Sequence, residues 1–369
     1  MLRRLRLEHF RNYQRLDLTL APGVNAFIGA NGQGKTNLLE AVYFLSLLRS
    51  FRTTKNNLLC LDGTGGFLLY GEADTASGDT VRLGVRQGTE RSLMVDGVPV
   101  RKSSDFISRF YCAPFLPEDL SLVKGMPSLR RRFLDIALCQ LEPTYLRICQ
   151  QFHEALKSRN AMLRTPDRYP REVITAFDPL LAETGAKMEF QRRALGEELN
   201  QALQECSAEF FPDGRILACS YLSGAGRLME KPPESVEEIQ ELYAKSLQDA
   251  FERDLREGCT RHGPQRSDLA CLLQTRNLTS FGSEGECRTA ALALRLAMME
   301  LLRKKHGGES LTILVDDVLG ELDATRRKAF LQRIADAGQV LFAGTALPPE
   351  FPREKVTLFH VDRGEVHPD

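Results

Sequence analysis

The sequence carries no net charge, because 49 basic side chains balance 49 acidic ones over 369 residues. A domain that binds nucleic acid through its overall charge is strongly basic, so any DNA contact of this chain must come from a local patch. The hydrophobic share of 43% and the charged share of 27% are ordinary for a soluble globular protein. The length allows two compact domains, or one domain with a large insertion.

The chain also lacks close cysteine pairs, a leader pattern and long apolar runs. None of its nine cysteines shows C-x-x-C spacing, which argues against a zinc or redox site and favours reduced, mostly buried thiols. Residues 1–8 alternate like a β-strand and have no signal-peptide apolar core. No apolar run approaches the ~20 residues that span a bilayer. We therefore expect a cytoplasmic protein with no membrane contact.

Periodicity along the chain predicts a β-rich domain that is split by a helical insertion. Residues 1–30 indicate short strands, and residues 67–100 indicate an antiparallel meander with a hairpin turn at Asp96-Gly97. The composition becomes helical at about residue 118, and prolines such as Pro166, Pro170 and Pro179 limit each helix there to a few turns. After residue 264, helix and strand alternate again. The expected parts are 1–117, 118–262 and 263–369.

One motif fits a phosphate-binding loop without a gap. It follows the strand that ends at Ile28 and opens a helix, and it matches G-x-x-x-x-G-K-[ST]. Its glycines let successive N–H groups face one anion, and the helix N-terminus adds partial positive charge. The expected nucleotide contacts are Gly29, Ala30, Asn31, Gly32, Gln33, Gly34, Lys35, Thr36 and Asn37. Lys35 would act on the β- and γ-phosphates and Thr36 would ligate Mg²⁺. A glycine-rich turn that serves packing alone is the alternative.

Two adjacent acids follow a strongly apolar segment, residues 311–315. A buried strand there would place Asp316 at its carboxyl end, the edge at which parallel sheets bind ligands. We expect Asp316 to be the magnesium carboxylate and Asp317 to polarise the attacking water. The alternative is a solvated strand end.

Two further patterns narrow the class of P-loop protein. Residues 283–288, Ser-Glu-Gly-Glu-Cys-Arg, resemble the signature of ABC-type ATPases, in which Ser283 and Gly285 would contact the γ-phosphate of ATP on the partner subunit. Residues 320–323 resemble the D-loop that follows the magnesium-binding strand. Ser-x-x-Glu is also a capping box, and Glu286 stands where such proteins usually have glutamine, so its side chain should turn back to the cap. The expected fold is an α/β ABC-type P-loop ATPase head with an antiparallel β-subdomain and an inserted, mainly helical domain.

Motifs over nearly the whole chain are similar to those of the RecF family of bacterial DNA repair proteins. They are residues 5–13 (LRLEHFRNY), 34–43 (GKTNLLEAVY), 49–52 (RSFR), 117–125 (PEDLSLVKG), 131–135 (RRFLD) and 316–323 (DDVLGELD). Residues 263–268 depart, since the family usually has histidine at Gln265 and aspartate at Ser267.

The resemblance implies a weak ATPase of recombinational repair and replication restart. Such a protein dimerises on ATP, holds duplex or gap-junction DNA, and acts with RecR and RecO to help load recombinase. Two basic clusters could contact the DNA backbone. They consist of Arg49, Arg52 and Lys55, and of Lys124, Arg130, Arg131 and Arg132. Solvated helix faces are the alternative for both clusters.

Competing functions remain open at this point. A structural-maintenance or Rad50-like head, or another ABC-type head that serves as an ATP-gated scaffold without its own DNA binding, shares the nucleotide motifs. The proline-broken insertion argues against a long coiled-coil arm. Threonine at 345, where transporter ATPases carry a switch histidine, argues against transport. Asp317 is one methylene shorter than the glutamate common in this superfamily, so its activation of water would be weak.

Overall fold

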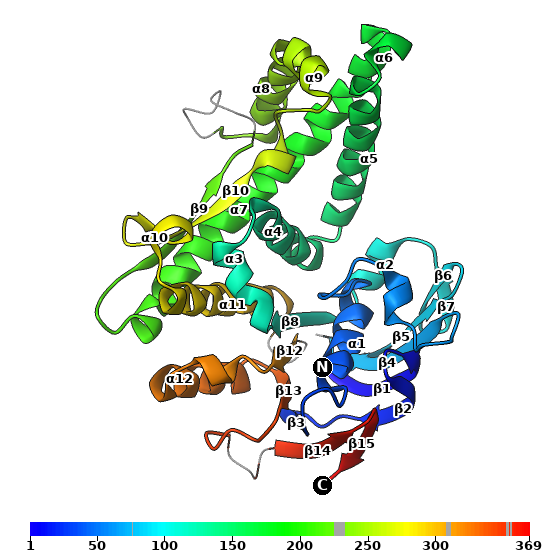
Figure 1. The fold of residues 1–369 in the computed structure, drawn as a ribbon, viewed down its shortest axis with the longest axis vertical. Coiled ribbons are helices and arrows are strands. Elements are labelled where there is room, and N and C mark those ends of the chain that lie inside the picture. Colours follow the sequence, from blue (N-terminus) through cyan, green and yellow to red (C-terminus); the bar gives the residue numbers. More distant parts are fainter. Residues whose placement is uncertain (76, 225–232, 308–310, 352–353, 355) are drawn as a thin grey trace. The chain divides into compact units, whose positions relative to one another are not determined.

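The computed structural model describes residues 1–75, 77–224, 233–307, 311–351, 354 and 356–369 (Figure 1). They form two compact units, residues 1–119 with 295–369 and residues 120–294. The first boundary lies close to the one expected at 117, whereas the second falls inside helix α11, Glu284–His306, and not at 262. Strand β10, Asp268–Leu273, explains the difference, because it pairs antiparallel with β9, Leu217–Leu222, of the insertion. Among the described helices, none combines the length and apolar character needed to cross a membrane.

The first unit contains a sheet in which five strands run parallel and one terminal strand runs antiparallel. The strand order is β15-β14-β3-β13-β12-β8. Their bounds are β3 Val24–Ile28, β8 Tyr111–Phe115, β12 Leu311–Asp316, β13 Gln339–Gly344, β14 Val356–Asp362 and β15 Glu365–Pro368. Both β12 and β13 are buried along their whole length, as continuous apolar runs in parallel sheets require. The strand predicted at 311–315 is thereby confirmed.

A second sheet of the first unit is antiparallel throughout. Its order is β2-β1-β4-β5-β6-β7. The bounds are β1 Leu2–Phe10, β2 Tyr13–Thr19, β4 Phe67–Asp74, β5 Thr80–Gln87, β6 Arg91–Val95 and β7 Val98–Val100. The predicted meander at 67–100 is confirmed, and its last hairpin turns at Asp96 and Gly97, both with positive φ. A two-residue turn in which both residues have positive φ has a backbone twist that matches the right-handed twist of the strands it connects.

Helix α1, Lys35–Leu47, contacts strands of both sheets of this unit. The helix that the phosphate-loop motif was expected to open is thereby confirmed, and nearly all of its residues are buried. The second half of α11, from Arg295 to His306, also belongs to this unit and is largely buried. The other described helical segments of the unit are short or lie at the surface. They are α2 Ser103–Ile107, α12 Ala324–Ala335, η1 Asn56–Leu59, η2 Pro117–Leu120 and η6 Leu319–Glu321.

The second unit is mainly helical. Its helices are α3 Ser121–Lys124, α4 Pro127–Leu141, α5 Tyr145–Leu163, α6 Arg171–Thr175, α7 Asp178–Phe210, α8 Val236–Asp249, α9 Phe251–Glu257, α10 Leu278–Phe281 and the first turns of α11, with short η3 Pro166–Arg168 and η4 Pro264–Arg266 and strand β11 Arg276–Asn277. The expectation that every helix spans a few turns is wrong for α7, which has 33 residues. Pro179 lies in its first turn, where the missing N–H costs no hydrogen bond, so it starts this helix.

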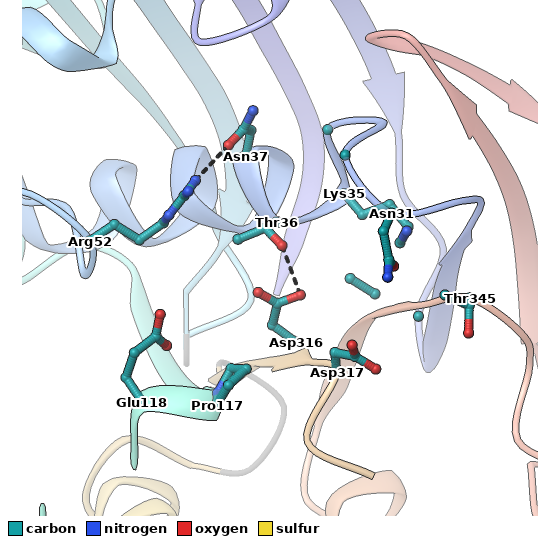
Figure 2. A pocket seen from close by; sticks show the side chains of 14 residues that line it. Asn31, Lys35, Thr36, Asn37, Arg52, Pro117, Glu118, Asp316, Asp317 and Thr345 are labelled. Carbon is teal, nitrogen blue, oxygen red and sulfur yellow. Dashed lines mark hydrogen bonds between the residues drawn. The ribbon is translucent and has the colours of Figure 1, made fainter. Parts of the chain in front are cut away.

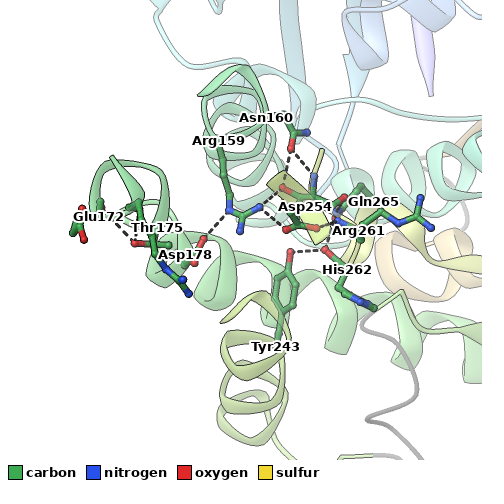
Figure 3. Close-up of polar contacts among 12 residues, drawn as sticks. Arg159, Asn160, Glu172, Thr175, Asp178, Tyr243, Asp254, Arg261, His262 and Gln265 are labelled. Atoms are coloured by element: carbon green, nitrogen blue, oxygen red, sulfur yellow. Dashed lines mark hydrogen bonds and ion pairs between the residues drawn. The ribbon is translucent and has the colours of Figure 1, made fainter. Parts of the chain in front are cut away.

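A buried arginine joins three segments of the second unit (Figure 3). The Arg159 guanidinium of α5 is fully buried and donates to Asp178 at the start of α7 (2.8 Å) and to Asp254 of α9 (2.7 Å). It also donates to the hydroxyl of Thr260 (2.8 Å). Burial raises the pKa of Asp178, with Arg159 acting in the opposite direction. Each charge here depends on the others for its compensation.

Replacement of Arg159 by leucine should therefore destabilise the protein strongly. It leaves the fully buried Asp254 carboxylate without its cation, and breaking one partner of a buried ion pair costs about 3–5 kcal/mol. Urea unfolding would measure the loss. Arg253→Ala is the matched control, because Arg253 forms an exposed i,i+4 pair with Glu257 and should change the free energy of unfolding by about 0.5 kcal/mol or less. Equal losses in the two variants would refute the role given to Arg159.

Candidate functional site

The phosphate-loop motif occupies residues 29–36, from the end of β3 to the first residues of α1. Two of its glycines have positive φ, +80° at Gly32 and +117° at Gly34, a conformation that side chains with a Cβ rarely adopt. A Cβ at Gly29 would lie 2.3 Å from the carbonyl oxygen of Val361 on β14. The loop conformation therefore depends on glycine for backbone freedom at two positions and for close packing at the third.

The ammonium of Lys35 bends back over this loop. It donates to the carbonyl oxygens of Gly29 (2.7 Å) and Ala30 (2.6 Å), and burial lowers its pKa. A third N–H of the ammonium remains for another acceptor. The loop thus holds a cation beside the N-terminus of α1, and a cation and a helix N-terminus both attract an anionic phosphate.

The hydroxyl of Thr36 donates to a carboxylate oxygen of Asp316 over 3.1 Å (Figure 2). Asp316 is the last residue of β12, and its side chain is almost completely buried. Burial raises its pKa to about 6. A hydroxyl and a carboxylate at this separation can both be ligands of one small, hard cation. Among the described residues, no group of three or more His, Cys, Asp and Glu is arranged to hold a metal, so such a cation would need phosphate and water oxygens as further ligands.

Asp317 differs from its neighbour in exposure and backbone conformation. Its φ of +46° is unusual for a residue with a side chain, and its N–H donates to Ala343 of β13 (3.2 Å). The exposed carboxylate lines the same cavity as Asp316 (Figure 2). It is therefore placed to contact water in that cavity.

The cavity in front of the loop has a volume of about 540 Å³ and is lined by the first unit alone. Of the predicted nucleotide contacts, six line this cavity, namely Asn31, Gly32, Gly34, Lys35, Thr36 and Asn37, whereas Gly29, Ala30 and Gln33 do not. Its wall also includes both acids and Arg52, Pro117, Glu118, Ala343, Gly344 and Thr345. Glu118 was missed as a site residue, although it follows β8, which pairs with β12 in parallel. Polar residues after neighbouring parallel strands gather at one sheet edge, and that signal could have identified it.

A buried carboxylate on α1 organises the segments around the loop. Glu40 is fully buried and accepts two bonds from Arg11 (2.8 Å each) and one from the Ser50 hydroxyl. Arg52 lies 3.9 Å from the same carboxylate and donates to Asn37 (2.9 Å). Sequence reasoning gave these contacts no role, because Arg11 belongs to the turn between β1 and β2 and reaches Glu40 only in the folded chain.

Asn12, the residue after Arg11, contacts the loop itself. Its amide donates to the carbonyl of Gln33 (3.0 Å) and its oxygen accepts from Asn37 (2.8 Å). A Cβ on Gly34 would lie 2.5 Å from the Asn12 amide nitrogen. The β1–β2 turn therefore supports the conformation of the phosphate loop through Asn12.

The signature-like residues belong to the second unit, at the start of α11. Ser283 and Gly285 are exposed, and a Cβ at Gly285 would meet nothing within 4 Å. The capping box is confirmed, since Glu286 accepts from the N–H of Ser283 (2.9 Å) and donates its own N–H to the Ser283 hydroxyl (3.3 Å). The Ser283 hydroxyl also donates to Glu286 (2.9 Å).

The residues that resemble a D-loop continue from β12. They contribute to η6 and end at Asp323, which accepts from the N–H of Arg326 (2.9 Å) and caps α12.

The two residues that depart from the family pattern, Gln265 and Ser267, have structural contacts in the second unit. Ser267 is fully buried and accepts from Arg192 (3.0 Å), and Gln265 donates to His262 (2.8 Å).

The seven candidate DNA contacts differ in exposure and in the partners that they already have. Arg130 is not available to contact DNA, because its guanidinium is buried and paired with both oxygens of Asp268 (2.7 and 2.8 Å). Arg52 lines the nucleotide cavity. Arg131 is half-buried and donates to Ser267 (2.7 Å), while Lys124 is exposed and donates to Gly282 (2.6 Å). The rest are exposed or half-buried, namely Lys55, Arg49 and Arg132.

Comparison with known proteins gives consistent matches over nearly the whole chain. The family described as the RecF/RecN/SMC N terminal domain matches residues 1–345. DNA replication and repair protein RecF of Exiguobacterium sp. is 33% identical over 372 residues, which cover 99% of this chain and 98% of the relative. RecF of Acidothermus cellulolyticus is 35% identical over 374 residues, 99% of each chain. A solved structure of the recombination mediator protein RecF with ATP, in the RecFOR pathway, has a TM-score of 0.91 at 28% identity and covers 100% of this chain and 97% of that one.

Alanine at Gly34 should disrupt the loop far more than alanine at Gly32. Both positions have positive φ, which costs a side chain roughly 1–2 kcal/mol, but only the Gly34 variant also collides with Asn12. We expect Gly34→Ala to lower the free energy of unfolding by about 3 kcal/mol and to abolish nucleotide binding. Urea unfolding and nucleotide titration of both variants would test this. Equal effects would show that Asn12 does not constrain the loop.

Proposed function

Because this chain belongs to the RecF family of DNA replication and repair proteins, we propose that it binds MgATP at residues 29–37 and dimerises on that nucleotide to hold DNA. ATP binding and the repair ATPase class follow from the family. The residue roles, the dimer and the DNA contact are the proposal. The observation that supports it most directly is the 3.1 Å contact between Thr36 and Asp316, beside the glycine loop and Lys35.

The ATP phosphates would lie along the backbone of residues 29–34, with the N-terminus of α1 directed at them. Lys35 would exchange its loop carbonyls for the β- and γ-phosphates, and Asn31 and Asn37 would flank them. Thr36 and Asp316 would hold Mg²⁺ together with phosphate oxygens and water. Bound magnesium would neutralise charge that develops on the phosphates, and the positive ion would keep the Asp316 carboxyl ionised.

Hydrolysis would rely on Asp317, which lines the cavity beside Asp316. Its carboxylate would orient a water toward the γ-phosphate and accept a hydrogen bond from it. Glu118 and Thr345 line the same space and could position that water. We expect slow turnover, because Asp317 is short and its backbone is held by Ala343 at an unusual φ, which limits how far the carboxylate can advance.

Closure would bring Ser283 and Gly285 of one chain to the ATP of another. Both are exposed at a helix N-terminus, where N–H groups and the helix dipole favour a phosphate oxygen. The γ-phosphate would then link the two heads, and its loss would release them. We propose that the closed dimer binds duplex or gap-junction DNA and that RecR and RecO are its protein partners. The solved RecF structure is described as part of the RecFOR pathway.

One observation favours a second function, an ATP-gated scaffold without its own DNA contact. The guanidinium of Arg130 is buried in an ion pair with Asp268 inside the second unit, and Arg52 lines the nucleotide cavity. If the chain does contact DNA, the remaining members of the two clusters would have to form that surface, namely Arg49, Lys55, Lys124, Arg131 and Arg132. Binding measurements can separate these functions.

The first test is the molar mass of Asp317→Asn by light scattering, with and without MgATP. We expect this variant to bind ATP, to cleave it slowly and to shift from monomer to dimer, because the nucleotide that stabilises the closed state persists. Ser283→Arg is the matched control, and should bind ATP with unchanged affinity yet stay monomeric. If both the wild type and Asp317→Asn bind ATP but remain monomeric, the proposed ATP-dependent dimer is wrong.

The second test is the salt dependence of duplex binding by the ATP-bound protein. If Lys55 contacts a phosphate, Lys55→Ala should weaken binding to every sequence and lower the slope of log K against log salt by about 1. Lys187→Ala is the control, because Lys187 is paired with Glu183 (2.6 Å) in the second unit. Undetectable duplex binding by the wild type would favour the scaffold.

A further inference from the structure

The carboxylate of Glu286 has two partners at the start of α11. One oxygen accepts from both the N–H and the hydroxyl of Ser283 (2.9 Å each). The other accepts from the guanidinium of Arg215. The hydroxyl that the proposed function assigns to the partner's ATP is therefore bound to a carboxylate, and that carboxylate is bound to an arginine.

Arg215 reaches Glu286 from the turn between α7 and β9. Its guanidinium also pairs with Asp213 (2.8 Å), and it lies over the ring of Phe211 at 5.4 Å. The next residue, Ile216, accepts a backbone bond from Gln274 (2.7 Å) after β10. Arg215 is thus fixed by its own turn and by the β9–β10 pair, and its side chain is only about one-third exposed, at 34%.

The charges around this contact favour an ionised Glu286. The bonds from Ser283 and Arg215 lower the pKa of Glu286 to about 2, the Ser283 backbone N–H being the largest cause. Glu284 is compensated separately by Arg288 (2.6 Å), and Lys124 donates to Gly282 (2.6 Å). Without Arg215, Glu286 would be an uncompensated negative charge directly beside Ser283, and it would repel an approaching γ-phosphate.

We propose that Arg215 is a positioning residue of the nucleotide-dependent dimer, which neutralises Glu286 and holds its carboxylate in the cap so that Ser283 can receive the partner's phosphate. This inference rests on the proposed function of Ser283. In the closed dimer the Ser283 hydroxyl turns from Glu286 to a phosphate oxygen, while Arg215 and the Ser283 N–H keep the carboxylate in place. Arg215 thereby compensates for an acid at a position where the family usually has glutamine.

A double substitution tests this coupling. Arg215→Met keeps an unbranched side chain but removes the guanidinium, and with it the positive charge and the contact with Phe211, so MgATP-dependent dimerisation should weaken by about tenfold or more. ATP affinity of the monomer should stay unchanged, because the nucleotide cavity is lined by the first unit. Adding Glu286→Gln to Arg215→Met should restore dimerisation, since the repelling charge is gone. Glu286→Gln alone should dimerise at least as well as the wild type.

Two controls separate charge from folding. Arg215→Lys keeps the cation and should retain most of the dimerisation. Asp213→Asn removes the charge of the other carboxylate that pairs with Arg215, and it should leave MgATP-dependent dimerisation unchanged. Thermal unfolding of every variant would detect a general loss of structure. Normal dimerisation of Arg215→Met, or failure of Glu286→Gln to restore it, would overturn this inference alone. A wild type that binds ATP and stays monomeric would overturn the proposed function as well.

Discussion

Parallel pairing on both sides of β13 is the constraint on which the nucleotide site depends. β3 pairs with one edge of β13 and β12 with the other, in registers that place Ile28 opposite Gly344 and Asp316 opposite Ala343. The last residues of β13 also accept the N–H groups of Gly29 (3.3 Å) and Asp317 (3.2 Å). Because parallel strands end at one edge, the glycine loop and both acids meet there although 280 residues separate Thr36 from Asp316.

Buried arginine–carboxylate pairs are the second recurring element. Arg11 with Glu40 braces the nucleotide loop, whereas Arg130 with Asp268 and Arg159 with Asp254 join distant segments within the second unit. Such pairs add little to stability compared with apolar packing, but they strongly penalise any arrangement that leaves one partner alone. They therefore favour one particular arrangement of these segments, and they explain why Arg130, which the sequence suggested as a DNA contact, is used inside the fold.

Local chemistry was predictable because its causes lie within a few residues. The glycine loop, Lys35, the buried strand before Asp316 and the capping box at Ser283 each follow from neighbours in sequence. The length of α7 does not follow from proline spacing, because proline usually interrupts a helix, whereas Pro179 lies in the first turn of α7 and starts it. The boundary between the units inside α11, at residues 294 and 295, could not be anticipated, because the pairing of β10 with β9 is a contact between segments about fifty residues apart.

The sequence by itself determined the class of ligand, the residues that form the phosphate loop and the strand that carries the acid, since each depends on backbone geometry within one short segment. Only the tertiary structure decided what stands around them. It placed Glu118 and Arg52 in the cavity, Asn12 behind the loop, Arg130 in a buried ion pair and Arg215 on Glu286. The partners in the last two pairs are 138 and 71 residues apart, and no local pattern encodes which charge will compensate which.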